Sequence, residues 1–378
     1  MDDSKDVAES ANKMREVNAR NDFFDRLVAR QGLVWMGQNT THVDPSPAVL
    51  EAIAASVQRR EFQVYAPPLG ITELRRLILE DLGLPDMEAL ITDGAVSGLS
   101  HICKIMAAEI SELVTTDPGW PWPEQFLASM GKPTRSINVY KPDVGYKLTA
   151  SQLIEGLKPR SLIYLIDPLN PLGSSYRPDE LRAICMAAKE SGSFLIHDCT
   201  YRHFAASPSL AASYYPEGTI TTYSFSKWLG LAGFRIGAIV APPALAVRFA
   251  AAPPNSLGSS IVAQRAAIAG LRQRSSWLEQ VRAANRASQE IVVQAFARNG
   301  LGSPLVYPSD GNFLALDVTS SGWRADDLAA ALLEQGVFIR SGTYQSKFSG
   351  QLFVKVSTAV PPSWAETLAK ALQGLKRG

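Results

Sequence analysis

The sequence is poor in cysteine, and it has neither a block of like charge nor a long apolar segment. Its 378 residues include three cysteines, an odd number without a CxxC spacing. Neither a disulfide framework nor a zinc site is therefore expected, and a reducing compartment is favoured. No stretch approaches the roughly 18 unbroken apolar residues of a membrane-spanning helix. The polar, mixed-charge first 25 residues lack the apolar core of a secretory signal peptide.

The net charge is also small. A formal value of +1 gives no electrostatic footprint for nucleic acid or for an anionic membrane. The four histidines have no metal-ligand spacing. With 46% hydrophobic and 19% charged residues, the chain has the composition of a globular protein. We therefore expect a cytoplasmic protein that binds no metal, nucleic acid or membrane.

Helical and strand patterns alternate from Pro45 onward. Short runs rich in Ile, Leu and Val, each followed by turn residues, predict strands in ALITDG, ELVTTDPGW, SLIYLIDPLNPLG, SFLIHDCTY, TITTYSFSK and RIGAIVAPP. Amphipathic segments such as PDELRAICMAAKESG lie between several of them. Apolar strands joined by helical crossovers predict an α/β fold with a large, doubly wound, mostly parallel sheet.

The pattern changes after about residue 260. One long helical stretch leads into three strand candidates, GNFLALDV, GVFIR and LFVKVST, which are interleaved with helices. We therefore predict three parts. Residues 1–44 form an N-terminal arm that joins the small domain, residues 45–270 a large ligand-binding domain, and residues 271–378 a smaller α+β domain.

Several polar or aromatic residues follow predicted strands, and ligands of such sheets bind at the carboxyl ends of the strands. Gly94 precedes a predicted helix whose free backbone amides suit a phosphate, although Asp-Gly is also an ordinary tight turn. Asp198 is either a helix-capping carboxylate or a partner for a protonated heteroaromatic nitrogen. Asn170 is either part of an Asn-Pro turn or a ligand contact, and Trp120 is either a core aromatic or a stacking surface.

A lysine stands in an unusual setting in SFSKWLGLAGFRIG, residues 224–237. Lys227 follows two serines, Ser224 and Ser226, and precedes Arg235 by eight residues. A buried lysine amine is a nucleophile for aldehydes, while hydroxyl groups and a guanidinium bind phosphate. A reactive lysine, a phosphate cradle, a partner for a pyridine nitrogen and a stacking aromatic together indicate pyridoxal 5′-phosphate.

The same stretch carries a family resemblance. SFSKWLGLAGFRIG matches every fixed position of S-x-S-K-x-x-G-L-x-G-x-R-x-G, the lysine motif of class I/II aminotransferases of fold type I. The similarity extends from about Gly37 to Leu375. Three segments are similar to the histidinol-phosphate aminotransferase branch of this family: the GLAG-R-G part of the lysine motif, GNF at residues 311–313, and NTTHVDPSP near the start.

The resemblance implies a role for each matching residue. Lys227 would form the internal aldimine with pyridoxal phosphate and then shuttle a proton, and Asp198 would pair with the pyridine nitrogen. The residues implied for the rest of the cofactor are the ring-hydroxyl contacts Asn170 and Tyr201, the stacking Trp120, and the phosphate ligands Gly94, Ala95, Val96, Ser224, Ser226 and Arg235. Tyr65 would reach the phosphate across a homodimer interface, so that the active sites are shared between subunits.

The substrate side departs from the family pattern. Most relatives bind the substrate α-carboxylate with an arginine in a late strand, where this chain has Lys355 in FVKVS. A lysine cannot form the planar two-bond fork of a guanidinium. Either Lys355 binds the carboxylate less rigidly, or Arg340 takes over, or the substrate anion is not an amino-acid carboxylate. Gly37, Asn39 and Asn170 are the other substrate contacts implied.

The predicted function is amino-group transfer between an amino acid and a 2-oxo acid. The loop APPNSLGSSIVAQ has no arginine for a second carboxylate, which disfavours a substrate with an acidic side chain. The alternative is a decarboxylase, lyase or oxidase that uses the same cofactor site. An aminotransferase-like effector domain of a transcription regulator is disfavoured, because fewer than forty residues precede Gly37.

Overall fold

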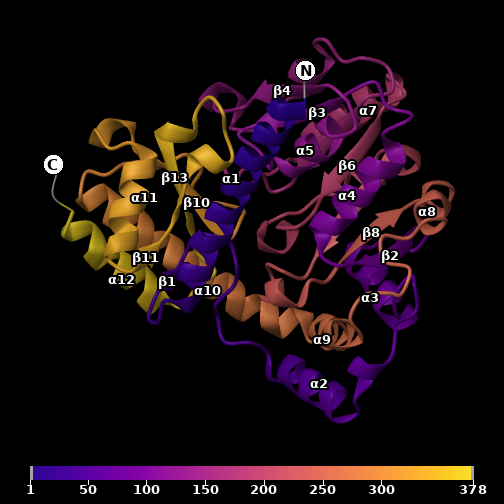
Figure 1. The fold of residues 1–378 in the computed structure, drawn as a ribbon, viewed down its shortest axis with the longest axis horizontal. Coiled ribbons are helices and arrows are strands. Elements are labelled where there is room, and N and C mark those ends of the chain that lie inside the picture. The colour runs from indigo at the N-terminus through magenta and orange to yellow at the C-terminus, as the bar shows by residue number, and fades with distance from the viewer. Residues whose placement is uncertain (1–2, 376–378) are drawn as a thin grey trace.

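The computed structural model describes the backbone of residues 3–375 and the side chains of residues 14–375. Two lobes are joined by a long helix, α10 (Arg274–Arg298) (Figure 1). The first two residues of the predicted N-terminal arm and the last three of the predicted small domain lie outside the described residues. No helix within residues 3–375 is long and apolar enough to cross a membrane.

The larger lobe contains a seven-stranded sheet in the order β2-β8-β7-β6-β5-β3-β4. Its strands are β2 (Glu88–Thr92), β3 (Leu113–Asp117), β4 (Thr134–Asn138), β5 (Leu162–Ile166), β6 (Phe194–Asp198), β7 (Thr219–Ser224) and β8 (Gly237–Ala241). Strand β8 runs antiparallel to β2 and β7, and the other pairs are parallel. The predicted mostly parallel α/β sheet is confirmed.

Both faces of this sheet are covered, and the central strands β3, β5, β7 and β8 are accordingly buried along their whole length. In β2, Leu90 packs into one core cluster, whereas Ala89 and Ile91 pack into the other. The first cluster contains side chains of α4 (Ala95–Met106), α7 (Pro178–Glu190) and α8 (Pro243–Ala250). The second contains side chains of α3 (Thr72–Leu82), α9 (Ile261–Arg272) and the start of α10. Helix α2 (Pro47–Gln58) packs on α9.

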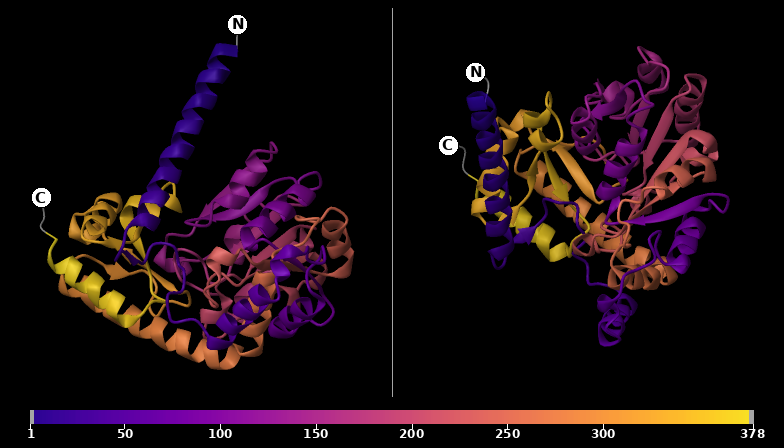
Figure 2. Two further views of the ribbon diagram at one scale, coloured as in Figure 1. Left: turned by 60° about the horizontal axis from the view of Figure 1, so that its bottom comes forward. Right: turned by 45° about the vertical axis from the view of Figure 1, so that its right-hand side comes forward.

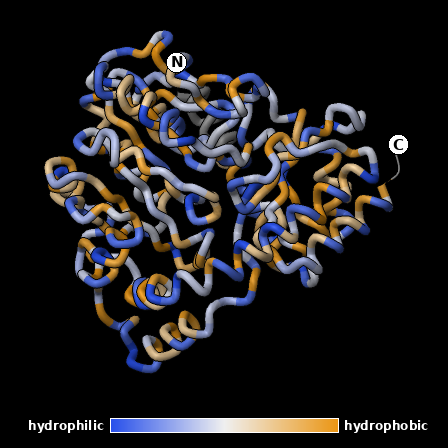
Figure 3. The backbone as a smooth tube through the Cα atoms, turned by 180° about the vertical axis from the view of Figure 1, so that it is seen from behind, coloured by the Kyte–Doolittle hydropathy of each residue, from blue (hydrophilic) through white to orange (hydrophobic). Residues whose placement is uncertain are grey.

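The smaller lobe has its own core and its own antiparallel sheet. The strand order is β12-β13-β10-β9, with β9 (Ser303–Pro304), β10 (Phe313–Asp317), β12 (Arg340–Ser341) and β13 (Phe353–Ser357). Its core is completed by side chains of α10, α11 (Ala325–Glu334) and α12 (Pro362–Gln373). Figure 3 shows that hydrophobic segments alternate with hydrophilic ones along the backbone in both lobes.

The N-terminal segment contacts the smaller lobe. Strand β1 (Val34–Trp35) pairs in parallel with β11 (Val337–Phe338). Helix α1 (Asp3–Ala29) lies beside the smaller lobe at its C-terminal end, and its N-terminal half projects from the molecule (Figure 2). The residue boundaries given above for the three domains stay a prediction.

Two local expectations differ from the structure. The long helical stretch after residue 260 is two helices, because Gln273 leaves helical geometry at φ −103° and ψ 14° between α9 and α10. Strand β4, in TRSIN, was not expected, because it lies at the sheet edge and its side chains are half exposed. Two short helices, α5 (Trp122–Ala128) and α6 (Ala150–Ile154), complete the larger lobe.

Candidate active site

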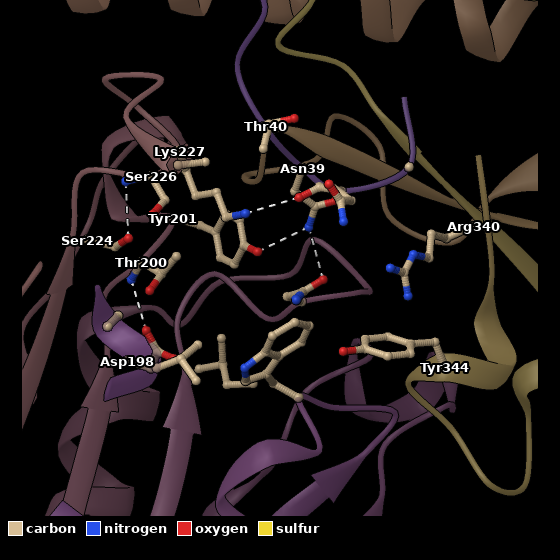
Figure 4. Close-up of a pocket in the computed structure, with 18 of the residues that line it drawn as sticks. Asn39, Thr40, Asp198, Thr200, Tyr201, Ser224, Ser226, Lys227, Arg340 and Tyr344 are labelled. Carbon is tan, nitrogen blue, oxygen red and sulfur yellow. Dashed lines mark hydrogen bonds between the residues drawn. The ribbon is translucent and has the colours of Figure 1, made fainter. Parts of the chain in front are cut away.

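A cavity of about 290 Å³ lies at the carboxyl ends of the large-sheet strands, between the two lobes. Figure 4 shows side chains from both lobes and from the N-terminal segment around it. The predicted site residues that line it are Gly37, Asn39, Ala95, Val96, Trp120, Asn170, Asp198, Tyr201, Ser224, Ser226, Lys227, Arg235, Arg340 and Lys355. Segments that are far apart in the sequence therefore meet in one cavity, and this cavity lies at the carboxyl ends of the strands, where a ligand was expected to bind.

Two predicted residues do not line this cavity. Gly94 lies behind it, with φ +84°, and a Cβ at this position would collide with the guanidinium of Arg235. The absence of a side chain lets Arg235 lie against the turn that precedes α4. Tyr65 follows a short 3-10 turn, Glu61–Gln63, and is 78% exposed on the surface.

Lys227 follows β7 and extends into the cavity. Its Nζ donates a hydrogen bond to the backbone oxygen of Gln38 at 3.0 Å. Burial, followed by the guanidinium groups of Arg235 and Arg340, lowers the pKa of Lys227 from 10.5 to about 8. No carboxylate within residues 14–375 forms an ion pair with this amine. A substantial fraction of Lys227 is therefore neutral and nucleophilic near pH 8.

Asp198 ends β6 on the floor of the cavity and is 4% exposed. Its Oδ2 accepts a hydrogen bond from the Tyr164 hydroxyl at 2.7 Å, and its Oδ1 accepts one from the Thr200 amide at 3.1 Å. Both donors are neutral, and no basic side chain within the described range pairs with this carboxylate. A buried anion with only neutral partners is well suited to receive a cationic ligand atom.

A network of amide side chains forms another wall of the cavity. Asn39 Nδ2 donates to Asn170 Oδ1 and to the Tyr201 hydroxyl, both at 3.1 Å. Asn39 has a left-handed backbone, with φ 54°, which its short polar side chain tolerates. Its backbone amide donates to Ser357 Oγ at 2.6 Å, and its carbonyl accepts from Asn312 Nδ2 at 2.8 Å. These bonds hold the N-terminal segment on the cavity.

Comparison with known proteins identifies the family. The family model described as "Aminotransferase class I and II" matches residues 31–372. The chain belongs to this family. It is 28% identical over 336 residues to histidinol-phosphate aminotransferase 1 of Mesorhizobium japonicum, and the match covers 86% of each chain. It is 27% identical over 326 residues to the probable aspartate/prephenate aminotransferase of Thermus aquaticus, with 82% of each chain covered.

Solved aminotransferases have the same fold. Aspartate aminotransferase from Thermus thermophilus with maleate superposes with a TM-score of 0.80 at 24% identity, over 95% of this chain and 94% of that one. N-succinyldiaminopimelate aminotransferase from Mycobacterium tuberculosis gives a TM-score of 0.81 at 24% identity, over 92% and 94% of the two chains. The predicted fold type I architecture is therefore confirmed.

Class I and II aminotransferases depend on pyridoxal phosphate, and the residues of this aminotransferase fit that cofactor. The cavity offers a buried carboxylate, Asp198, and an amine, Lys227, neither of which forms an ion pair with another side chain of residues 14–375. Arg235 lies beside the N-terminus of α4, where free backbone amides favour a phosphate. These are the partners that a pyridine nitrogen, an aldehyde and a phosphate require.

Lys355 lies on β13 within the same cavity and is 3% exposed. Its Nζ is 3.4 Å from Asn170 Oδ1 and 5.9 Å from the centre of the Phe313 ring. Burial, followed by Arg340 and Lys227, lowers the pKa of Lys355 well below 10.5. No ion pair joins it to a carboxylate within residues 14–375.

Several cavity-lining residues were missed by sequence reasoning: Arg20, Phe24, Gln38, Leu99, Ile166, Thr200, Ala232 and Tyr344. Gln38 and Thr200 adjoin predicted site residues, and that adjacency was a usable signal. Arg20 and Phe24 had no such signal, because they lie in a polar helix whose position is set by packing against the smaller lobe.

Proposed function

We propose that Lys227 is the catalytic base of this aminotransferase and that Asp198 is the partner of the cofactor ring. The chain transfers amino groups with pyridoxal phosphate, as its family does. The observation that carries the assignment is the presence in one cavity of an amine with a lowered pKa and a buried carboxylate, neither of which forms an ion pair within residues 14–375. A lone buried charge is costly unless a ligand compensates it.

The remaining cofactor residues are proposed from their positions in the cavity. Arg235, Ser224, Ser226 and the first amides of α4 would hold the phosphate. Asn170 and Tyr201 would contact the ring hydroxyl, since both already share Asn39 as a hydrogen-bond partner. Trp120 would lie against the ring, and its indole packs edge-on to Tyr344 at a centroid distance of 5.7 Å.

Pyridoxal phosphate supplies an electron sink that stabilises negative charge at the Cα of the bound amino acid. Lys227 Nζ would take the proton from that Cα, because its pKa, lowered to about 8, leaves a larger fraction of the amine neutral at physiological pH than in an ordinary lysine. Asp198, buried and oriented by Tyr164 and Thr200, would pair with the ring nitrogen of the bound cofactor and favour its protonated form. The N-terminal segment, which contributes residues 37–40 to the lining of the cavity, would limit the access of water to the reacting carbon.

The substrate α-carboxylate is proposed to bind at Lys355, with Asn170 alongside it and Gly37 and Asn39 at the opposite wall. Arg340 is the cross-strand partner of Lys355 in the sheet register. It is therefore close enough to be the competing anchor, and variants of the two residues distinguish the alternatives.

A homodimer with shared active sites is proposed from an exposed apolar surface near α2. Phe62 is 60%, Val64 62% and Tyr65 78% exposed, which is unusual for large side chains clustered in one segment. In the dimer, Tyr65 would reach the phosphate bound by the partner subunit. Sedimentation that gives only the monomer mass at micromolar concentration would contradict this proposal.

The proposed setting is amino-acid biosynthesis in the cytoplasm. The histidinol-phosphate and aspartate/prephenate names of the relatives support a biosynthetic role. The three buried free cysteines are compatible with a reducing compartment.

The reaction is tested by incubating the holoenzyme with a panel of amino acids and with pyruvate or 2-oxoglutarate. The expected result is a new amino acid and a new 2-oxo acid in equal amounts, with the cofactor spectrum alternating between two forms. Release of carbon dioxide, ammonia or peroxide without a new amino acid would contradict amino-group transfer and would favour the alternative chemistries.

The lowered pKa of Lys227 predicts a pH profile for cofactor attachment. Below pH 8 the amine is increasingly protonated and unreactive, and above pH 8 it is increasingly neutral. Attachment of pyridoxal to the apoenzyme, trapped with borohydride, is therefore expected to reach half its maximal rate near pH 8. In Arg340→Gln the midpoint should rise, since a neighbouring cation is removed. A wild-type midpoint near 10.5, the ordinary lysine value, would refute the prediction.

A further inference from the structure

A second pocket, of about 600 Å³, lies where the end of α3, the segment that follows β6 and the first turns of α10 meet. It shares no lining residue with the cavity that contains Lys227 and Asp198. Three guanidinium groups line it, those of Arg202, Arg274 and Arg282. The pocket therefore has the charge of an anion site, and it is separate from the active site.

One buried carboxylate is already shared among several donors in this pocket. The Asp81 side chain is 3% exposed, and Arg274 Nη1 donates to its Oδ1. Its Oδ2 accepts from the Tyr223 hydroxyl at 2.7 Å and lies 2.9 Å from His203 Nε2. Arg202 Nη1 is farther away, 3.8 Å from the same oxygen. Asp81 is therefore occupied mainly by Arg274, Tyr223 and His203.

The other two arginines keep unused donors. Arg282 Nε donates to the His203 carbonyl at 2.6 Å, whereas its two Nη atoms form neither a hydrogen bond nor an ion pair within residues 14–375. Arg202 Nε is buried without a hydrogen-bond partner in the same range. Burial, followed by the charge of Arg202, lowers the pKa of Arg282. Two neighbouring cations that repel each other are stabilised by an anion between them.

A second carboxylate on the pocket wall does not neutralise these arginines. Glu279 is exposed and forms no ion pair within residues 14–375. The lining thus carries three guanidinium groups against two carboxylates, and one of those carboxylates points into solvent-exposed surroundings.

The shape of the pocket indicates which anion fits. A phosphoryl group presents three oxygens in different directions and suits guanidinium groups from separate elements, whereas a carboxylate presents two oxygens in one plane. Arg202 follows β6 and Arg282 belongs to α10. The volume exceeds that of a lone phosphate, and Leu278, one helical turn before Arg282, adds an apolar wall. A phosphate monoester with a small organic group matches these features.

The pocket adjoins the catalytic residues through short covalent and stacking contacts. Arg202 and His203 directly follow Tyr201, which lines the active-site cavity. The His203 ring stacks on Trp228 at a centroid distance of 4.6 Å, and Trp228 directly follows Lys227. A ligand that attracts Arg202 would therefore act on segments that carry both Tyr201 and Lys227.

We propose that this pocket is an effector site, in which Arg202 and Arg282 bind the phosphoryl group of a small phosphate monoester and Leu278 contacts its organic part. The occupied site would alter the surroundings of Lys227, which is a coupling between two separate sites. Binding goes beyond the proposed function and does not depend on it, whereas the effect on Lys227 rests on that function.

The test measures binding to the holoenzyme by calorimetry, with phenyl phosphate, inorganic phosphate and benzoate as probes. Arg282→Gln removes a proposed contact, and Arg282→Lys keeps its charge. Arg298→Gln is the matched control, because Arg298 is exposed on the same helix and does not line the pocket. The second readout is the pH midpoint of the cofactor absorbance change, measured with and without phenyl phosphate.

Phenyl phosphate is expected to bind once per chain, about tenfold tighter than benzoate or inorganic phosphate at low ionic strength. Arg282→Gln should weaken this binding about tenfold, Arg282→Lys should weaken it less, and Arg298→Gln should leave it unchanged. Bound phenyl phosphate should raise the absorbance midpoint by about 0.3 pH units or more, because an added anion favours a protonated amine. The midpoint of Arg282→Gln should not respond to the same concentration.

Absence of binding, tighter binding of benzoate, or equal weakening by Arg282→Gln and Arg298→Gln would overturn the site. Equal affinity for inorganic phosphate would overturn the proposed contact with the organic group. Binding that leaves the absorbance midpoint unchanged would overturn the effector role. Failure of the proposed function looks different: no new amino acid is formed in the panel assay, while calorimetry, which needs no reaction, still reports the affinity of this pocket.

Discussion

Replacement of Lys227 by alanine is expected to lower kcat by about 10⁴-fold or more, because the base and the covalent attachment point are lost together. Pyridoxal phosphate should still bind, since Arg235, Ser224 and Ser226 remain. The variant should therefore retain a cofactor spectrum that differs from that of the wild type. Activity is measured as single-turnover conversion of the bound cofactor by an amino acid.

Added methylamine should restore part of the activity of Lys227→Ala, because a small amine can take the proton at Cα in place of the missing side chain. A purely structural loss would not respond to the amine. Lys104→Ala is the matched control, since Lys104 is exposed on α4 and does not line the cavity. Activity of Lys227→Ala within tenfold of this control would contradict the assignment.

Lys355→Met is expected to lower kcat/KM for α-amino acids by about 100-fold and to make the protein more stable. Methionine has a similar length but no amine. The substrate carboxylate would lose its proposed cation, while the fold would lose a buried amine that has no ion-pair partner within the described residues. Steady-state kinetics and thermal unfolding of the holoenzyme measure the two effects.

The gain in stability should depend on pH. The folded-state pKa of Lys355 is lowered, so the unfolded chain binds more protons at this site than the folded chain. The cost of keeping Lys355 buried is therefore largest at low pH and decreases as pH rises from the lowered pKa toward 10.5. The difference in Tm between Lys355→Met and wild type should decrease across the same range.

Lys355→Arg, which supplies a planar fork, is the companion variant and should lower KM for ordinary α-amino acids. A different pattern would assign the anchor to Arg340. In that case Lys355→Met would leave KM unchanged, and Arg340→Gln would raise it.

Most of the residues proposed to hold the cofactor could be identified in the sequence because they lie at or within a few positions of the end of a strand; Arg235 and Tyr65 do not. Ser224 ends β7, Ser226 and Lys227 follow within three residues, and Asp198 ends β6. A parallel sheet aligns the ends of its strands, so local patterns were sufficient to predict that these side chains meet. The sheet itself could be predicted because short runs of Ile, Leu and Val mark strands that are buried on both faces.

Features set by tertiary packing could not be read from the sequence. Helix α1 is polar, and Arg20 reaches the cavity only because Phe23 and Leu27 dock on the smaller lobe. The break between α9 and α10 is at Gln273, a residue with no helix-breaking signature, within a continuous helical pattern. Strand β4 is half exposed at an edge, so its sequence lacks the apolar run of the central strands.

The most direct test of the account is the site at which borohydride fixes the cofactor. Reduction of the holoenzyme, proteolysis and mass spectrometry should place pyridoxal phosphate on the peptide that contains Lys227, with one cofactor per chain. The neighbouring cavity lysine, Lys355, should be unlabelled, because it is assigned to the substrate carboxylate. Labelling of Lys355 or of any other lysine in place of Lys227 would contradict the central assignment.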